Sequence, residues 1–264
     1  MKQKINFITY GDSKKYEISK KHILNLAKHS GFFNECLGMS KKDINLKFKN
    51  SFEKILSEKR GGGYYIWKIP IIQQSLESLN EGDLLVYSDS GSSFNFYAKK
   101  RFFEYVDLIN DSNFGNLRFE SKKSHIEKNW TSREIFEYFN IDIDSDVGDS
   151  IQLLGGHLIF KKNEHTDNFF NIFLKLLREN PLLVTDFYKE DQIDQFVENR
   201  HDQSIMSIIS KKFGGVILEN ETFFEKDSPD QHSYPFLSVR HYGHGFKDKI
   251  KYRLGHKRST PIYF

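Results

Sequence analysis

Three consecutive glycines, followed by an apolar strand that ends in an aspartate, constrain this chain more than any other feature. The stretch covers residues 60–94 and contains R-G-G-G-Y-Y-I-W-K-I-P-I-I and then D-L-L-V-Y-S-D-S-G-S-S-F. Consecutive glycines let the backbone come close to a ligand. The strand brings Asp89 to its carboxyl end, where open α/β sheets bind ligands. The stretch therefore predicts a ligand site at the end of a buried strand.

Strands and helices alternate before this stretch. Residues 5–8 predict a strand that ends in the turn-rich residues 9–12, T-Y-G-D, and residues 14–29 predict an amphipathic helix. A second strand is expected at residues 32–37, and a helical segment at residues 46–56 leads to the glycines. This order is typical of an α/β sheet with helical crossovers.

Further helices and strands are expected after the aspartate. Aromatic and basic residues are interleaved over residues 94–106. Such a mixture also occurs in sites for single-stranded nucleic acid, but we interpret it as a helix with an aromatic core face. Residues 131–134, T-S-R-E, have the form of a capping box and predict the start of a helix. Residues 151–160 predict a strand that contains a glycine pair, Gly155 and Gly156, where a strand bulges or a ligand comes close.

Composition limits the classes of function. The 264 residues include 39 Lys and Arg against 36 Asp and Glu, so nucleic acid is not the expected partner. Cys36 is the only cysteine, which excludes an internal disulfide and favours a reducing compartment. The first residues contain too short an apolar run for a signal peptide, and no run approaches the ~18 residues of a membrane span. We expect one soluble, cytoplasmic domain.

Polar residues gather at two further places. Residues 199–204, N-R-H-D-Q-S, open a predicted helix, whose N-terminus can bind an anion or a hydroxyl. The alternative is that Asp202 caps the helix and its neighbours are exposed. In residues 240–247, two histidines stand beside glycines and can complete a metal site begun by a carboxylate. The basic residues that follow serve either solubility or a weak contact with an anionic membrane.

Together these stretches resemble the GT-A type glycosyltransferases. They are similar to a group in bacteria and large DNA viruses that shares a glycine-tryptophan-lysine loop, a strand ending in a short aspartate motif, and an H-D-Q-S helix start. The matching stretches are residues 60–68, 83–91, 152–162 and 200–204, with weaker matches at residues 9–12 and 130–131. Their shared order along the chain is harder to obtain by chance than any single motif.

The resemblance implies a single α/β domain over residues 1–264. Its Rossmann-like nucleotide-binding half, about residues 1–95, would hold a mixed sheet flanked by helices, and about residues 96–264 would form the acceptor-binding half and tail. The implied reaction moves a sugar from a nucleoside-diphosphate sugar, expected to be UDP-linked, to a hydroxyl of a glycan or glycoprotein. Neither nucleic acid nor a transmembrane segment is implied.

The resemblance also implies a divalent cation, Mn or Mg, on the donor diphosphate. In GT-A enzymes a D-x-D motif holds this cation, which neutralises the leaving group. Asp89 matches the first place of the motif, whereas Gly91 replaces the second acid and puts metal dependence in doubt. In a related group a C-terminal histidine and lysine bind metal and phosphate, and His241 and Lys247 stand at a similar separation.

By the same resemblance, particular residues are assigned to each part of the site. The donor side would comprise Thr9, Tyr10, Gly11, Arg60, Gly62, Trp67, Lys68, Ser88, Asp89, Gly91 and Lys247. The acceptor side would comprise Gln152, Gly155, Gly156 and His201, the metal ligands would be Asp89 and His241, and the catalytic residues Asp202 and Gln203. Asp202 would act as a base if the product inverts, whereas Asp202 or Gln203 would stabilise an oxocarbenium-like centre if configuration is retained. The Trp67 ring stacks on base or sugar or belongs to the core, and we favour the core.

Two alternatives from other classes remain open. The first is a nucleotide-sugar or glycan-binding protein whose catalysis is impaired, which is motivated by Gly91. The second is a sugar nucleotidyltransferase, because both enzymes use an α/β nucleotide-binding half. Those enzymes usually carry a glycine-rich loop after the first strand, whereas this chain has T-Y-G-D, with one glycine, at residues 9–12.

Overall fold

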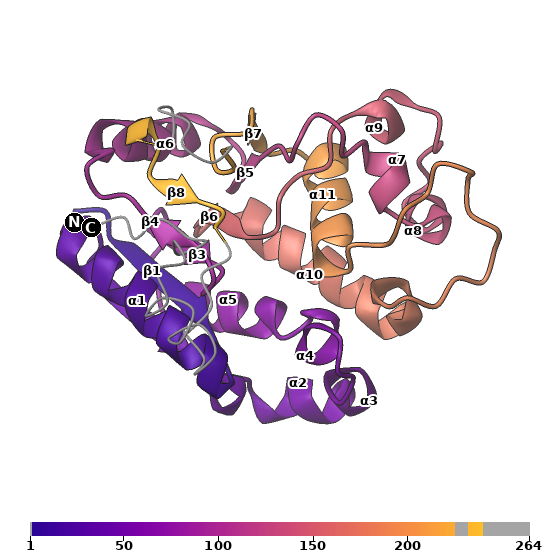
Figure 1. Ribbon diagram of the computed structural model, residues 1–264, viewed down its shortest axis with the longest axis horizontal. Coiled ribbons are helices and arrows are strands. Elements are labelled where there is room, and N and C mark those ends of the chain that lie inside the picture. The colour runs from indigo at the N-terminus through magenta and orange to yellow at the C-terminus, as the bar shows by residue number, and fades with distance from the viewer. Residues whose placement is uncertain (1, 225–231, 240–264) are drawn as a thin grey trace, which may run out of the picture.

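A six-stranded sheet in the order β2-β1-β3-β6-β5-β7 forms the centre of the structure, a computed structural model that describes residues 2–224 and 232–239 (Figure 1). Its strands are β1 (Ile5–Tyr10), β2 (Glu35–Met39), β3 (Leu84–Ser88), β5 (Asn116–Phe119), β6 (His157–Lys161) and β7 (Val216–Leu218). β6 is antiparallel to β3 and β5, and the other neighbouring pairs are parallel. The expected α/β fold with a mixed sheet flanked by helices is confirmed.

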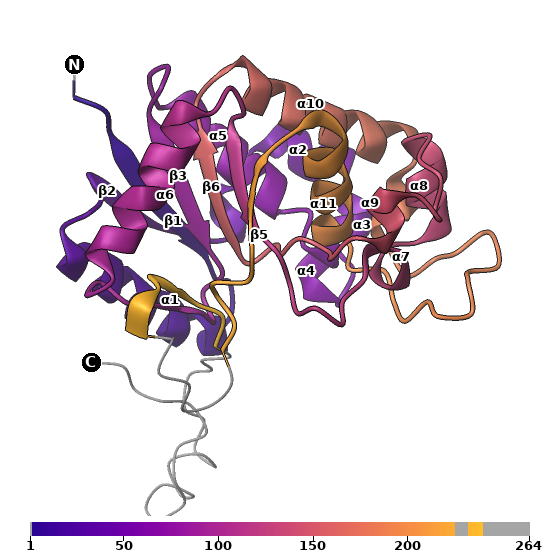
Figure 2. The ribbon, with the colours of Figure 1, turned by 90° about the horizontal axis from the view of Figure 1, so that it is seen from above.

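Helices cover both faces of the sheet (Figure 2). The longer ones are α1 (Lys14–Ser30), α5 (Lys68–Glu77), α6 (Lys99–Asp111), α10 (Glu164–Glu179) and α11 (Asp202–Phe213). Short helical turns are η1 (Lys41–Asp43), α2 (Leu46–Ser51), α3 (Glu53–Leu56), α4 (Gly61–Tyr64), α7 (Glu127–Trp130), α8 (Arg133–Tyr138), α9 (Asp146–Asp149) and η2 (Pro181–Val184). A small antiparallel pair joins β4 (Ser93–Phe94) to β8 (Phe236–Leu237).

The alternation of side chains along the central strands builds two separate cores. Phe7 and Val86 point to the face covered by α1 and α6, whereas Ile8 and Tyr87 point to the face covered by α5, α10 and α11. All four side chains are fully buried, as expected for parallel strands covered on both sides. Both cores therefore depend on the same strands.

The chain reverses direction across the sheet between β1 and β3. β1 pairs with β2 on one side and with β3 on the other, so the chain first moves to β2 and later returns past β1. The helix after β1 and the helix before β3 pack on opposite faces, so the carboxyl ends of the two strands lie at the point where open α/β sheets form a ligand-binding crevice. Gly11 and Asp89 directly follow these ends.

Three predicted elements begin later than the sequence indicates. The second strand starts at Glu35, because the Asn34 backbone and side chain bond the backbone of Ile5 and hold a turn. The strand expected at residues 151–160 starts at His157, since the preceding residues make only isolated bridges to another segment. The helix expected at residues 94–106 starts at Lys99, because Phe94 belongs to β4.

The capping box expected at residues 131–134 is wrong in detail, although a helix starts nearby. Ser132 precedes α8 without a side-chain cap, and the Thr131 hydroxyl donates to Glu127 at 2.6 Å instead. The Glu134 carboxylate accepts from the backbone N–H groups of Lys189 and Glu190, at 2.7 and 3.1 Å. Distant partners thus replace the local cap.

A buried carboxylate fixes α11 against the turn at α7. The side chain of Glu127 is fully buried, and its Oε2 accepts from Lys211 Nζ at 2.6 Å. Its Oε1 accepts from Thr131 Oγ1 at 2.6 Å and from Gln152 Nε2 at 3.1 Å. A buried charge is tolerated only when it is paired and hydrogen-bonded in this way.

We expect Glu127→Ala to lower the free energy of unfolding by about 3 to 5 kcal/mol, because it leaves the Lys211 ammonium buried without its anion. Urea denaturation measures the loss. Lys128→Ala is the control, because it breaks ion pairs to two exposed carboxylates and should cost at most about 1 kcal/mol. Equal losses in the two variants would contradict the assigned role of Glu127.

Candidate functional site

Asp89 opens the site at the crevice between β1 and β3. Its backbone N–H donates to Gly156 O at 2.8 Å, which fixes the turn that follows β3. Its Oδ1 accepts from Tyr87 Oη at 2.6 Å, while the side chain stays 48% exposed. Tyr87 lies two residues earlier on the same face of the strand, which explains the contact. One carboxylate oxygen is thus anchored, and the group still faces solvent.

Lys68 joins Asp89 to a second carboxylate. The lysine is the first residue of α5 and is only 3% exposed, and its Nζ lies 2.7 Å from Asp202 Oδ2 and 3.6 Å from Asp89 Oδ1. The same Nζ donates to Gly155 O at 2.9 Å. One buried ammonium group therefore connects β3, α5, α11 and the turn before β6.

Burial and charge pairing act in opposite directions at this pair. Burial disfavours the Lys68 ammonium, but Asp202 and Asp89 outweigh it and raise the pKa of Lys68 above its ordinary value. Burial raises the pKa of Asp202, and Lys68 opposes that shift. The Asp202 side chain is 4% exposed, so of the two carboxylates only that of Asp89 can meet a ligand without rearrangement.

The start of α11 differs from the expected cap. His201, not Asp202, is the N-cap residue, with φ 58° and ψ −119°, a region that side-chain-bearing residues rarely occupy. Its Nδ1 donates to Val184 O at 2.9 Å, and its ring lies 4.9 Å from that of Tyr64. Burial lowers the pKa of His201, which keeps the ring neutral. The alternative in which Asp202 caps the helix is therefore wrong.

The amide of Gln203 is held in one orientation. Its Oε1 accepts from Gly155 N at 3.1 Å, and its Nε2 donates to Gln152 Oε1 at 2.7 Å. A Cβ at Gly155 would lie 3.1 Å from Gln203 Cβ, and one at Gly156 would lie 3.1 Å from Asp89 Oδ2. The glycine pair thus allows Gln203 and Asp89 to approach the same turn, as the sequence suggested for a close contact.

The glycine loop forms a left-handed turn over residues 61–65. Gly61, Gly62 and Gly63 have φ of 57°, 61° and 101°, and Tyr64 and Tyr65 follow with φ of 51° and 63°. Glycine adopts this conformation freely, but each tyrosine costs about 1 to 2 kcal/mol there. Strained backbone of this kind is concentrated at functional sites.

Trp67 and Arg60 hold the two ends of this turn. Trp67 Nε1 donates to Gly61 O at 2.8 Å, and the buried Trp67 ring stacks on Tyr10 with centroids 3.8 Å apart. The Arg60 guanidinium lies 3.3 Å from Asp186 and 2.6 Å from Glu198. Trp67 is therefore part of the core, and Arg60, expected on phosphate, contacts carboxylates of residues 185–200.

The structure brings most of the predicted site residues to the strand ends and the start of α11. Tyr10, Gly11, Lys68, Asp89, Gln152, Gly155, Gly156, Asp202 and Gln203 lie there, with Gly62, Trp67, Gly91 and His201 close to them in the chain. Thr9 and Ser88 are fully buried and point to the other face of the sheet, away from Tyr87 and Asp89. His241 and Lys247 lie outside the described residues.

Sequence reasoning missed three side chains around the site. Tyr87 and Tyr65 surround Lys68, whose Nζ lies 5.2 and 5.9 Å from their ring centroids. Side chains two residues apart on a strand lie on the same face, so the sequence could have placed Tyr87 beside Asp89. His157 is fully buried, with Nδ1 3.0 Å from Ser88 Oγ, and its Nε2 has no partner among the described residues. No local signal marks His157.

We expect the free energy of unfolding to fall by up to about 3 kcal/mol between pH 6.5 and 4 because of His157. Burial lowers the pKa of His157 to about 4. Over this pH range His157 therefore binds a proton in the unfolded chain but stays neutral in the folded protein. Urea titrations at several pH values measure the slope. The slope should shrink in His157→Gln but not in His29→Gln, whose side chain is exposed; an unchanged slope in His157→Gln would exclude the assignment.

The described residues do not by themselves fit a divalent cation. No group of three or more His, Cys, Asp or Glu side chains in residues 2–224 and 232–239 is placed to hold one. At the site, Asp89 offers Oδ2, since Oδ1 already accepts from Tyr87 and faces Lys68. Hard cations such as Mg²⁺ and Mn²⁺ need several oxygen ligands.

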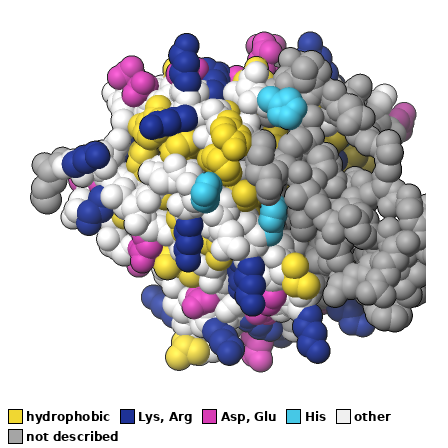
Figure 3. All heavy atoms as spheres, turned by 60° about the vertical axis from the view of Figure 1, so that its left-hand side comes forward, with side chains coloured by type: hydrophobic (Ala, Val, Ile, Leu, Met, Phe, Trp, Pro, Cys, Tyr) yellow, Lys and Arg dark blue, Asp and Glu magenta, His cyan; other side chains and the backbone are white. Residues whose placement is uncertain are grey.

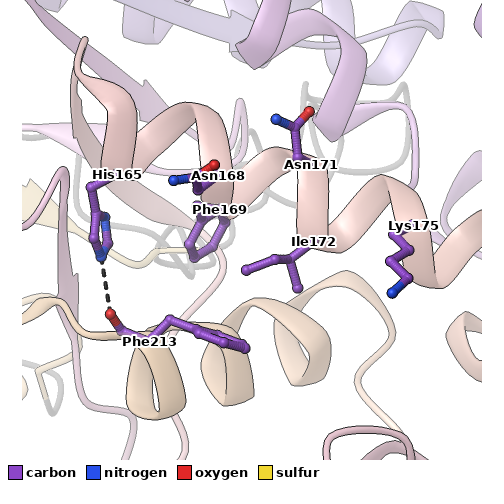
Figure 4. Close-up of a pocket in the computed structure, with 7 residues that line it drawn as sticks. All are labelled: His165, Asn168, Phe169, Asn171, Ile172, Lys175 and Phe213. Atoms are coloured by element: carbon purple, nitrogen blue, oxygen red, sulfur yellow. Dashed lines mark hydrogen bonds between the residues drawn. The ribbon is translucent and has the colours of Figure 1, made fainter.

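A separate cavity of about 430 Å³ lies between α10 and the end of α11 (Figure 4). It is lined by His165, Asn168, Phe169, Asn171, Ile172, Lys175 and Phe213. None of the predicted site residues lines it. Within the described part of the chain, no helix combines the length and the apolar character needed to cross a bilayer.

No protein-family model matches the chain, and no curated protein is similar to it. Among solved structures, it is similar to a glycosyltransferase involved in the glycosylation of the major capsid of PBCV-1, with a TM-score of 0.49 and 13% identity over 88% of this chain and 91% of that one. The bifunctional glycosyltransferase WbbM has a TM-score of 0.49 and 14% identity, over 84% of this chain and 39% of that one. Mouse xyloside xylosyltransferase 1 has a TM-score of 0.44 and 9% identity, over 92% of this chain and 97% of that one. These three are glycosyltransferases. At such identities and TM-scores below 0.5, the similarity assigns neither family nor substrate.

Proposed function

We propose that this protein transfers a sugar from a nucleoside-diphosphate sugar, UDP-linked, to a hydroxyl of a glycan or glycoprotein. One observation carries the proposal: the half-exposed carboxylate of Asp89 stands at the β1/β3 crevice and is tied through Lys68 to Asp202, next to the amide of Gln203. A crevice at such a point is where open α/β sheets bind nucleotides. We assign the chain to the GT-A type on this arrangement and on the order of its motifs.

The donor would lie along the carboxyl ends of β1 and β3. Tyr10 and Gly11 end β1 beside Trp67, and the left-handed turn at residues 61–65 allows close approach of a polar ligand. Arg60 reaches a diphosphate only if it exchanges its contacts with Asp186 and Glu198. The acceptor would approach from the side of Gln152 and His201.

In the proposed reaction the bond between the sugar C1 and the diphosphate breaks while the acceptor oxygen bonds to C1 and loses its proton. A protein base takes that proton if configuration inverts, whereas the leaving diphosphate oxygen takes it if configuration is retained. Because Asp202 is enclosed and paired with Lys68, we assign it electrostatic stabilisation of the positive charge that develops on the sugar, together with Gln203. This assignment favours retention of configuration over inversion.

A divalent cation, Mn²⁺ or Mg²⁺, remains part of the proposal for the donor complex, where it would neutralise the leaving diphosphate. Among the described residues Asp89 is the candidate ligand, and His241 lies outside them. Since the described residues do not form a metal centre alone, no step of the reaction is assigned to the metal.

Asp89→Asn should reduce hydrolysis or transfer of the nucleotide sugar at least about a hundredfold, because it removes the charged group that faces the crevice. Release of nucleoside diphosphate measures the rate, and thermal shifts with UDP-sugars, with and without Mn²⁺, measure binding. Asp107→Asn, on the exposed side of α6, is the control. Wild-type turnover in Asp89→Asn would remove Asp89 from the site.

Lys68→Met should move the acidic limb of the pH profile of kcat/KM to higher pH. The substitution removes the ammonium that opposes the effect of burial on Asp202, so the pKa of Asp202 rises further and the carboxylate is lost at a higher pH. Lys68→Arg keeps the charge and should restore the limb in part, and near-UV circular dichroism monitors the fold. An acidic limb that stays in place in a folded Lys68→Met would exclude this coupling.

An impaired nucleotide-sugar-binding protein is the second candidate. Gly91 in place of a second acid and the incomplete metal site of the described residues favour it. A thermal shift with a nucleotide sugar, without hydrolysis or transfer over long incubation, would select this function. Release of pyrophosphate from a nucleoside triphosphate and a sugar phosphate would instead identify a sugar nucleotidyltransferase.

A further inference from the structure

Positive charge is concentrated at the two ends of the chain. Residues 240–264 contain 7 Lys and Arg and 1 Asp. Residues 1–60 contain 14 Lys and Arg and 6 Asp and Glu. Residues 61–239 contain 18 Lys and Arg and 29 Asp and Glu. Residues 1–60 therefore carry a net charge of +8 and residues 61–239 one of −11. A local excess of this size attracts anionic partners at long range where its cations share one surface.

Helix α1 presents part of this charge as one stripe. Lys14, Lys21 and Lys28 recur every seven residues, which places them on the same side of an α-helix. Ile18 and Asn25 occupy the positions between them. All five are exposed, and Ile18 is 51% exposed despite its apolar side chain. We call these five residues the α1 stripe.

The lysines of the α1 stripe are not neutralised by neighbouring acids. On α1 the ion pair is between Lys20 and Glu17, and within the described part of the chain none is formed by the three stripe lysines. Other surface helices pair their cations at one-turn spacing, as Lys100 does with Glu104 and Lys175 with Glu179. Such pairs are usual on a solvated helix face, so the stripe is a departure.

An exposed apolar side chain accompanies the positive charge of the α1 stripe. Ile18 stands between Lys14 and Lys21 along the helix, and its side chain is half exposed. Figure 3 shows this side of the molecule, where Lys and Arg side chains stand among hydrophobic ones. Lysines beside an exposed aliphatic side chain can contact lipid headgroups and the boundary of the acyl chains at the same time.

We propose that the α1 stripe is a docking surface for the headgroups of an anionic lipid bilayer. Each lysine close to such a surface strengthens binding roughly fivefold, so three lysines contribute roughly a hundredfold. Ile18 gains from entering the boundary of the acyl chains, a gain that a nucleic acid does not offer. The stripe begins at Lys14, just past the end of β1, so a bilayer along α1 lies beside the rim of the crevice.

The full-length protein should co-sediment with vesicles of phosphatidylcholine and phosphatidylglycerol, and not with phosphatidylcholine alone. Binding should decrease at high salt, because counterions screen charges at an exposed surface. Equal binding to neutral vesicles, or no binding to anionic ones, would overturn the proposal. The measurement involves no sugar substrate, so its outcome is independent of the proposed function.

Variants locate the surface. Lys14→Gln, Lys21→Gln and Lys28→Gln combined should weaken binding to anionic vesicles roughly a hundredfold. The matched control combines Lys123→Gln, Lys175→Gln and Lys189→Gln, three exposed lysines in the net-negative part of the chain, and should bind as the wild type does. Equal binding by the two triple variants would overturn the assignment to α1. Far-UV circular dichroism verifies that α1 is still folded.

A single apolar substitution separates lipid from other polyanions. Ile18→Ser should weaken vesicle binding severalfold and leave retention on single-stranded DNA cellulose unchanged, because only the bilayer accepts the aliphatic side chain. If Ile18→Ser binds vesicles as well as the wild type, or if DNA competes with vesicles at equal charge concentration, the surface is a general polyanion site and the proposal fails.

Discussion

The buried ammonium group of Lys68 is the interaction on which the candidate site depends. Two buried charges are stable only when they lie close together and their remaining hydrogen bonds are satisfied, and Lys68 meets this condition with Asp202 and Gly155 O. Its partners come from segments far apart in the chain. The site therefore forms only after the sheet, α5 and α11 have packed, and any disturbance of one element reaches the others through Lys68.

Backbone strain surrounds this charged centre. The left-handed turn at residues 61–65 and the unusual conformation of His201 meet where Tyr64 contacts the imidazole ring. Both are held by surrounding contacts, namely the stacking of Trp67 on Tyr10 and the hydrogen bond from His201 to Val184 O. Residues 185–200 connect to the same turn through Arg60. The strained backbone is thus fixed before any ligand arrives, which favours a pre-organised site.

Helix α1 links the crevice to the outer surface. Its inner side fills one of the two cores with Ile23 and Ala27, while its outer side carries the α1 stripe. Because α1 begins where β1 ends, the proposed lipid surface and the proposed donor site share one turn of chain. An acceptor attached to a membrane would then be presented at the level of the crevice, whereas a soluble acceptor needs no such arrangement.

Local patterns in the sequence predicted β1, α1 and the position of Asp89 at the end of a buried strand, because period and turn residues are properties of neighbouring residues. The tertiary structure alone decided that β6 enters the sheet antiparallel between β3 and β5, and that Asp202 lies enclosed against Lys68 instead of capping α11. It also turned Ser88 away from the crevice and joined Glu134 to residues 189 and 190. Strand pairing and buried ion pairs bring together residues that are distant in the chain. Their free energy comes from desolvation and close contact, which no local pattern encodes.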